Sequence, residues 1–108
     1  MATITFGPIT GDGTGTLTEW TGGYAVIWIG AENVTDGYDF GGGTVTLQIS
    51  DENNADGART LKKGSNGLVK TAKYMTTMYI PPSWLRYVMA DVDPPGSADL
   101  NIVIETLT

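Results

Sequence analysis

Apolar and polar residues alternate along much of the chain, and this period of two predicts β-strands. The range Thr44–Ser50 shows it most clearly, because Val45, Leu47 and Ile49 alternate with polar side chains. Elsewhere, runs rich in Thr, Val, Ile and aromatic residues are separated by clusters of Gly, Asn and Asp at intervals of roughly ten residues. No window keeps apolar residues at helical spacing without interruption by Gly, Pro or a run of Thr. The pattern therefore predicts an all-β protein of seven or eight mainly antiparallel strands, folded as a β-sandwich or a jelly-roll-like barrel.

Turn residues set the expected bounds of these strands. Gly7-Pro8 ends the first strand, Gly22-Gly23 reverses the chain after the second, and Pro81-Pro82 interrupts a later pair, because proline cannot donate to a ladder. The candidate strand ranges are Ala2–Phe6, Thr14–Trp20, Tyr24–Glu32, Thr44–Ser50, Tyr74–Ile80, Trp84–Asp91 and Asp99–Leu107. Two further segments, Ala58–Lys63 and Leu68–Lys73, could pair with each other as an arm.

The candidate strand Tyr24–Glu32 differs from the others because both of its faces are apolar. Its two faces consist of Tyr24, Val26 and Trp28 and of Ala25, Ile27, Ile29 and Ala31. Burial on both sides is expected for a central strand whose outer face meets a neighbouring subunit or a covering loop. We expect Trp28 to pack in the core.

Length and composition indicate a single β domain over residues 1–108, with residues 1–13 as an extended N-terminal segment. The sequence contains no Cys and no His, which excludes a disulfide framework, a thiolate zinc site and a Ser-His or Cys-His nucleophile. We therefore expect no catalytic residues, no cofactor and no bound metal, and we predict that the protein is not an enzyme. Neither a signal peptide nor a membrane-spanning segment is predicted.

The positive charges are concentrated in one part of the chain. Five of the six basic residues are Arg59, Lys62, Lys63, Lys70 and Lys73. The net charge of −6 is thus the sum of +5 in this window and −11 in the remainder. We expect the window to form a hairpin arm around Gly64-Ser65-Asn66-Gly67, because Asn-Gly accepts positive φ angles. The arm is either simply solvated or a docking surface for an acidic partner. The overall acidity argues against general nucleic-acid binding.

Motifs that would carry catalytic or metal chemistry are weak. The segment Asp51–Gly57 is rich in oxygen ligands, but Lys63 stands where a calcium loop starting at Glu52 needs a bidentate Glu, so a turn is expected. An oxygen cluster of Asp36, Asp39, Asp91 and Asp93 would require two loops to meet. Gly41-Gly42-Gly43 lacks the Lys and Ser or Thr of a phosphate loop.

Three sequence segments resemble a family of small virion structural proteins of tailed phages. The segments are Trp20-Thr21-Gly22-Gly23, Phe40-Gly41-Gly42-Gly43-Thr44-Val45-Thr46-Leu47-Gln48 and Ile80-Pro81-Pro82-Ser83-Trp84-Leu85-Arg86. The third departs from the family pattern at Ile80 and at Ser83-Trp84. These motifs describe strand and turn geometry, and the resemblance extends over most of the chain.

The resemblance implies a decoration, or cement, protein of the capsid. Such a protein would bind the phage major capsid protein as a homo-oligomer, with a trimer favoured, and would stabilise the expanded lattice without catalysis. It would be made in the host cytoplasm and would lie on the capsid surface, with no nucleic acid and no membrane as partners. The N-terminal segment or the basic arm would contact the capsid.

Aromatic residues supply the expected subunit interface and also the alternative function. Trp84, Arg86 and Tyr87 are the candidate interface residues, since Trp and Arg are enriched among interface anchors. Alternation along this strand places either Trp84, Arg86 and Val88 or Leu85, Tyr87 and Met89 inside. The alternative is a carbohydrate- or receptor-binding module of a phage tail or fibre, in which exposed rings in a groove would stack on a glycan.

Overall fold

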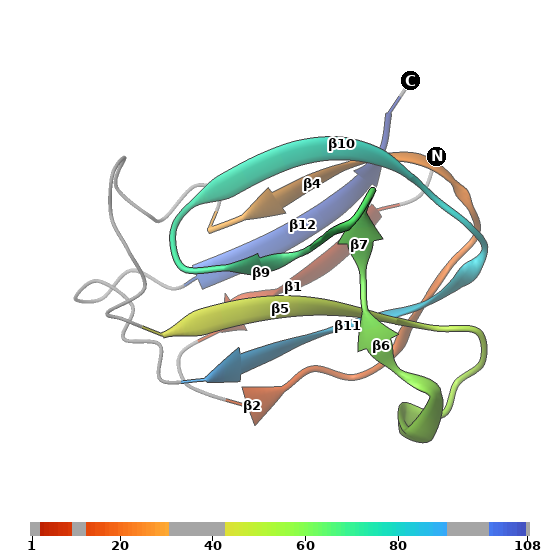
Figure 1. Ribbon diagram of the computed structural model, residues 1–108, viewed down its shortest axis with the longest axis horizontal. Helices are drawn as coiled ribbons and strands as arrows, with labels where there is room; N and C mark the ends of the chain where they lie inside the picture. Colours follow the sequence, from red (N-terminus) through yellow and green to blue (C-terminus); the bar gives the residue numbers. More distant parts are fainter. Residues whose placement is uncertain (1–2, 10–12, 31–42, 91–99, 108) are drawn as a thin grey trace.

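The computed structural model describes residues 3–9, 13–30, 43–90 and 100–107, which form two antiparallel sheets packed face to face (Figure 1). In sheet A the strands follow the order β1 (Thr3–Ile9), β12 (Leu100–Thr106), β4 (Gly23–Ile29) and β10 (Tyr74–Ile80). All pairings in this sheet are antiparallel. The all-β sandwich predicted from the sequence is confirmed.

Sheet B is built around two long strands, and its outer strands are short. Its order is β2 (Gly13–Thr14), β11 (Ser83–Ala90), β5 (Thr44–Ser50) and β6 (Arg59–Thr60), with β3 (Thr18–Trp20) also on β11 and β9 (Val69–Lys70) also on β5. A separate hairpin pairs β7 (Lys62–Lys63) with β8 (Asn66–Gly67). The one helical element of the described residues is a 3₁₀ turn over Ala55–Gly57, so the segment Asp51–Gly57 is the turn that was predicted.

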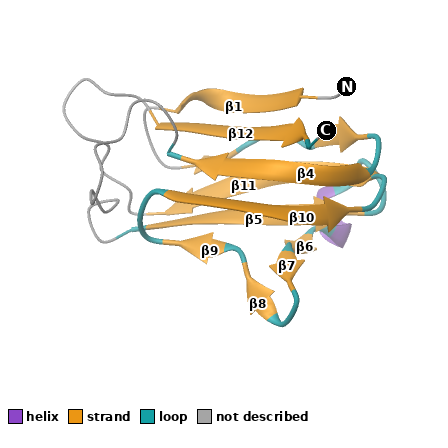
Figure 2. Ribbon diagram, turned by 90° about the horizontal axis from the view of Figure 1, so that it is seen from above, coloured by secondary structure: helices purple, strands orange, loops and turns teal. Residues whose placement is uncertain are grey.

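The core lies between the two sheets (Figure 2). Alternate residues of each long strand point inward, as a pleated strand requires. The largest fully buried side chains are Trp20, Ile27, Ile29, Val45, Leu47, Leu68, Ile80, Leu85, Ile102 and Ile104. On β11 the inward set is Leu85, Tyr87 and Met89, which decides between the two alternations that the sequence left open.

The N-terminal strand is part of this sandwich. Residues 3–9 form β1 at the edge of sheet A, where Thr3 pairs with Glu105 and the register shifts between Phe6 and Ile9. Ile4, Phe6 and Ile9 are buried. The strand therefore continues beyond the Gly7-Pro8 stop predicted from the sequence, because a bulge accommodates the proline at an edge. This part of the predicted N-terminal segment belongs to the core.

Two strand pairs pass from one sheet to the other at the same corner. Trp20 of β3 pairs with Ser83 of β11 in sheet B, and Gly23 of β4 pairs with Ile80 of β10 in sheet A. The links are Thr21-Gly22 and Pro81-Pro82. The Trp20 indole Nε1 donates to the carbonyl of Ile80 at 3.1 Å and holds the two crossings together.

The backbone of Gly22 fits against the other link at this corner. Gly22 has a φ of +101°, and a Cβ added there would lie 2.8 Å from Cγ of Pro82. Both the left-handed backbone and the close approach require glycine. The corner is thus fixed by one glycine, one proline pair and one buried indole.

The basic arm does not form the continuous hairpin predicted from the sequence. Lys62–Lys63 and Asn66–Gly67 pair with each other, around a turn at Gly64 and Ser65 in which Gly64 has a φ of +65°. Next to this pairing, Leu68 N donates to the carbonyl of Leu61 at 2.8 Å. The flanking strands β6 and β9 both pair with β5. The predicted hairpin is therefore present at the tip only, because beyond Leu61 and Leu68 the two segments pair with the edge of β5 instead of with each other.

The base of the arm is anchored in the core. Leu61 and Leu68 are buried, Leu61 N donates to the carbonyl of Leu47, and Leu47 N donates to the carbonyl of Leu68. The base of the arm therefore belongs to sheet B, and only its short tip projects.

Candidate functional site

The outer side of sheet A carries an apolar surface that we call the apolar face. It is built from the outward residues of three neighbouring strands, which the register places in rows. The rows are Val103–Trp28–Met75, Glu105–Val26–Thr77 and Leu107–Tyr24–Tyr79. Seven of these nine side chains are apolar or aromatic, and Glu105 is the single charged residue among them.

The rings and the thioether of the apolar face are strongly exposed. Tyr24 is 63% exposed, and Met75 and Tyr79 are each 52% exposed. The Tyr24 and Tyr79 rings meet edge to face, with centroids 5.6 Å apart and planes inclined by 70°. Monomeric soluble proteins rarely leave such neighbouring apolar side chains in water unless the surface binds something. The face is the leading candidate site on this molecule.

Trp28 belongs to this face, so its predicted place in the core was wrong. Its side chain is half-buried on the outer side of β4, and its Nε1 donates to Oε1 of Glu105 at 3.0 Å. A strand that is apolar on both sides gives no signal about which side faces inward, and the indole N–H favours a position within reach of an acceptor. Trp20 is the tryptophan of the core, with no exposed surface.

The cations of the basic arm take up different roles. Lys63 Nζ donates to Oγ1 of Thr76 at 2.6 Å, and Lys70 Nζ lies 3.8 Å from the centroid of the Tyr74 ring. Both contacts tie the arm to β10. Lys73 is exposed just before β10, Lys62 is exposed at the tip, and Arg59 lies at the base of the arm. The structure does not bring the five cations together into one cluster.

The contact between Lys70 and Tyr74 is expected to contribute measurably to the free energy of unfolding. Replacing Lys70 with Met keeps the aliphatic stem and removes the charge above the ring. We expect the free energy of unfolding to fall by ~0.5–1 kcal/mol, as for a partly exposed cation–π pair. Urea unfolding measures the change. Arg59→Met is the matched control, because it removes another exposed cation of the arm that contacts no aromatic ring among the described residues, and it is expected to leave the midpoint unchanged. Equal effects of the two variants would contradict the assignment.

The three candidate interface residues on β11 point to opposite sides of sheet B. Trp84 and Arg86 lie on the outer side, and both are half-buried. Arg86 Nε donates to Oε1 of Gln48 at 2.7 Å. Tyr87 instead packs inward, with its ring 5.3 Å from that of Phe6 on β1. Of the three, only Trp84 and Arg86 are placed for contact across the outer side of sheet B.

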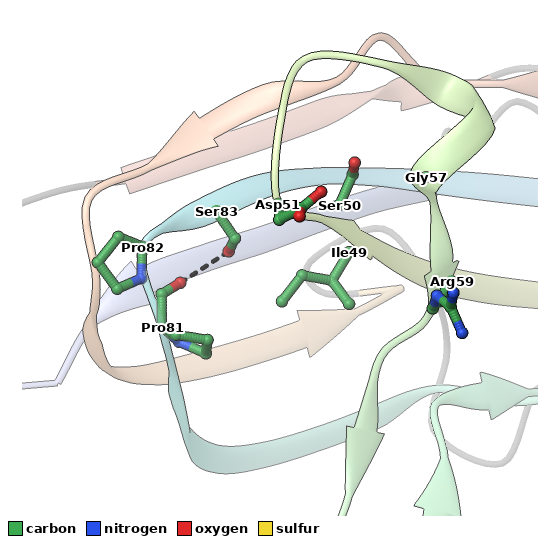
Figure 3. A pocket seen from close by; sticks show the side chains of 8 residues that line it. All are labelled: Ile49, Ser50, Asp51, Gly57, Arg59, Pro81, Pro82 and Ser83. Atoms are coloured by element: carbon green, nitrogen blue, oxygen red, sulfur yellow. Dashed lines mark hydrogen bonds between the residues drawn. The ribbon is translucent and has the colours of Figure 1, made fainter.

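Two neighbouring hollows lie near the corner between the sheets. The first, of about 390 Å³, is lined by Ile49, Ser50, Asp51, Gly57, Arg59, Pro81, Pro82 and Ser83 (Figure 3). The Ser83 hydroxyl in it donates to the carbonyl of Pro81 at 2.7 Å. The Ser50 hydroxyl donates to the carbonyl of Asn54 at 3.2 Å. Both hydroxyls are therefore occupied by the protein itself.

The second hollow, of about 340 Å³, lies around Trp84 and is called the Trp84 hollow. Its lining consists of Glu19, Trp20, Thr21, Asp51, Pro82, Ser83 and Trp84. Glu19 pairs with Trp84 across β3 and β11, and both Glu19 and Asp51 are exposed. The hollow thus combines an indole, a proline ring and two carboxylates.

Within the described ranges there is no group of three or more His, Cys, Asp or Glu side chains that could hold a metal ion. The oxygen cluster considered for Asp36, Asp39, Asp91 and Asp93 lies outside the described residues. The described residues also contain no helix long and apolar enough to cross a bilayer.

Comparison with known proteins found no match. No protein-family model, no curated protein and no solved structure matches the chain.

Proposed function

We propose that the protein is a non-enzymatic structural protein of a phage virion that binds the capsid lattice as a decoration protein through the apolar face. The observation that supports this most directly is the exposure of Tyr24, Tyr79 and Met75 on the same outer side of two paired strands. Burying a large apolar side chain contributes ~1.5–3 kcal/mol, so a surface with several of them can hold a partner without chemistry. The major capsid protein is the proposed partner.

The composition of the face indicates what this partner surface must contain. Most of the face is apolar, and its one carboxylate, Glu105, uses Oε1 to accept from Trp28. We therefore expect an apolar capsid surface with a Lys or Arg facing Glu105, because a buried carboxylate needs a charged or hydrogen-bonding partner.

The same features disfavour two other occupants of the face. A second copy related by a twofold axis would present Glu105 again, on a chain whose net charge is already −6. A glycan chain would need rings that lie flat beneath successive sugars, and the Tyr24 and Tyr79 planes are inclined by 70°. The glycan-binding alternative is therefore less well supported than a protein partner here.

Co-sedimentation with expanded capsids of the phage tests the proposal. The double variant Tyr24→Ser/Tyr79→Ser removes two exposed rings and leaves the core untouched. We expect it to bind at least about 100-fold more weakly than the wild type, which corresponds to losing ~3 kcal/mol of interfacial burial. Val69→Ser removes another exposed apolar side chain, on β9, and should bind normally. Unchanged capsid binding of the double variant would contradict the proposal.

A further inference from the structure

The Trp84 hollow has the chemistry of a site for a basic side chain. Trp84 is half-buried and paired across the strands with Glu19, while Asp51 and Pro82 complete the walls. Among the described residues, neither Glu19 nor Asp51 has an ion-pair or hydrogen-bonding partner for its carboxylate. A cation placed there would lie beside two carboxylates and an indole side chain, which together favour Lys or Arg.

The chain itself carries a projecting basic tip. Figure 2 shows the β7–β8 hairpin extending beyond the two sheets. Residues 62–66 are all exposed, and the Lys62 ammonium has no hydrogen-bonding partner within the described part of the chain. The buried Leu61 and Leu68 hold the base of this tip to β5, so the tip is presented from a fixed support.

We propose that the tip of the basic arm of one copy docks in the Trp84 hollow of a second copy, with Lys62 facing Glu19 and Asp51. The charge distribution of the sequence supports this occupant, because the window from Arg59 to Lys73 has a net charge of +5 and the rest of the chain has a net charge of −11. Copies whose net charges repel each other can still associate where a basic segment meets an acidic hollow.

The contact joins two different surfaces, and this has a consequence for the assembly. In a dimer joined head to tail, one copy still has a free tip and the other a free hollow, so further copies can add. Such an assembly closes into a ring when the rotation between neighbouring copies permits. The inference rests on the proposed function in treating the protein as an assembly component. It identifies the contact through which copies of the proposed oligomer would associate, and it involves no residue of the apolar face.

Charge reversal on each side, measured by sedimentation velocity over a range of concentrations, tests the contact. Wild type is expected to form a multiple of the 11.4 kDa chain, and added salt should weaken the association. Lys62→Glu and Glu19→Lys should each weaken it about tenfold, since an attraction becomes a repulsion. The triple variant Lys62→Glu/Glu19→Lys/Asp51→Lys should associate within about threefold of wild type, because both charge pairs are restored with opposite signs.

Two further variants separate this contact from general charge effects. Glu52→Lys makes the same charge change at an exposed position outside the hollow and should leave the association unchanged. Trp84→Ala should weaken the association, because the indole side chain that lines the hollow is lost.

A wild type that stays at 11.4 kDa at every concentration would overturn the inference. A triple variant that associates no better than Lys62→Glu alone would do so too. Monomers whose retention on a glycan column depends on Trp84 would overturn it in favour of a sugar site. Tyr24→Ser/Tyr79→Ser should keep the wild-type mass, so the failure of self-association and the failure of capsid binding can be told apart.

Discussion

Replacing Trp20 with Ala is expected to lower the free energy of unfolding by ~3–5 kcal/mol, as for other buried Trp and Phe truncations. The side chain has no exposed surface and lies at the corner where the β3–β4 and β10–β11 links pass from one sheet to the other. The substitution leaves a cavity and also removes the donor to the carbonyl of Ile80. A domain of this size has a total stability of ~5–15 kcal/mol, so this single substitution should remove a large fraction of it.

The matched comparison is Trp28→Ala on the outer side of sheet A. This side chain is half-buried, and its removal exposes no core. We expect a loss of ~1–2 kcal/mol, from partial burial and from the bond to Glu105. Chemical denaturation of the two variants under the same conditions measures the difference. An equal loss, or a greater one at Trp28, would show that the two indoles have been assigned to the wrong sides.

Replacing Gly22 with Ala should destabilise the protein by ~2–6 kcal/mol. Part of this, ~1–3 kcal/mol, comes from forcing a Cβ onto a backbone with a φ of +101°. The rest, again ~1–3 kcal/mol, comes from the clash with the Pro82 ring, which the added methyl would approach to 2.8 Å.

The neighbouring Gly23 separates the two contributions. Its φ of +123° is equally unfavourable for a side chain, yet a Cβ there would meet nothing within 4 Å. Gly23→Ala should therefore lose only the backbone part. Thermal or urea unfolding of both variants gives the steric contribution as the difference. If Gly22→Ala is no worse than Gly23→Ala, the two corner links do not pack as closely as described.

The strands that the sequence predicts best are those with a single buried side and clear stops. Thr44–Ser50 and Tyr74–Ile80 have the predicted bounds in the structure. In the first, alternation separates the two faces. In the second, Pro81-Pro82 removes two donors and ends the ladder. For such strands local chemistry alone is sufficient.

Features that depend on distant parts of the chain could not be predicted in this way. The outward position of Trp28 depends on Glu105, which is 77 residues away in sequence. The division of the basic arm depends on the free edge of β5, which a local hairpin pattern does not reveal.

The apolar face was only partly foreseen. The two apolar sides of the strand that begins near Tyr24 predicted a second buried surface, to be met by a subunit or a loop. The sequence did not show that Met75 and Tyr79 would extend this surface on the neighbouring strand. That follows from the pairing of β4 with β10, which aligns Tyr79 with Tyr24 and Met75 with Trp28. Scoring both faces of every candidate strand would have found these residues but not their register.

The place of β12 in sheet A determines when this protein can fold during synthesis. β12 lies between β1 and β4, so β1 has no strand to pair with until Leu100–Thr106 has left the ribosome. Pairings between residues so far apart in sequence slow folding, because a long loop must close first. We therefore expect the nascent chain to gain protease resistance in one late step. A chain stopped before residue 100 would expose an unpaired edge of β4 and be prone to aggregate.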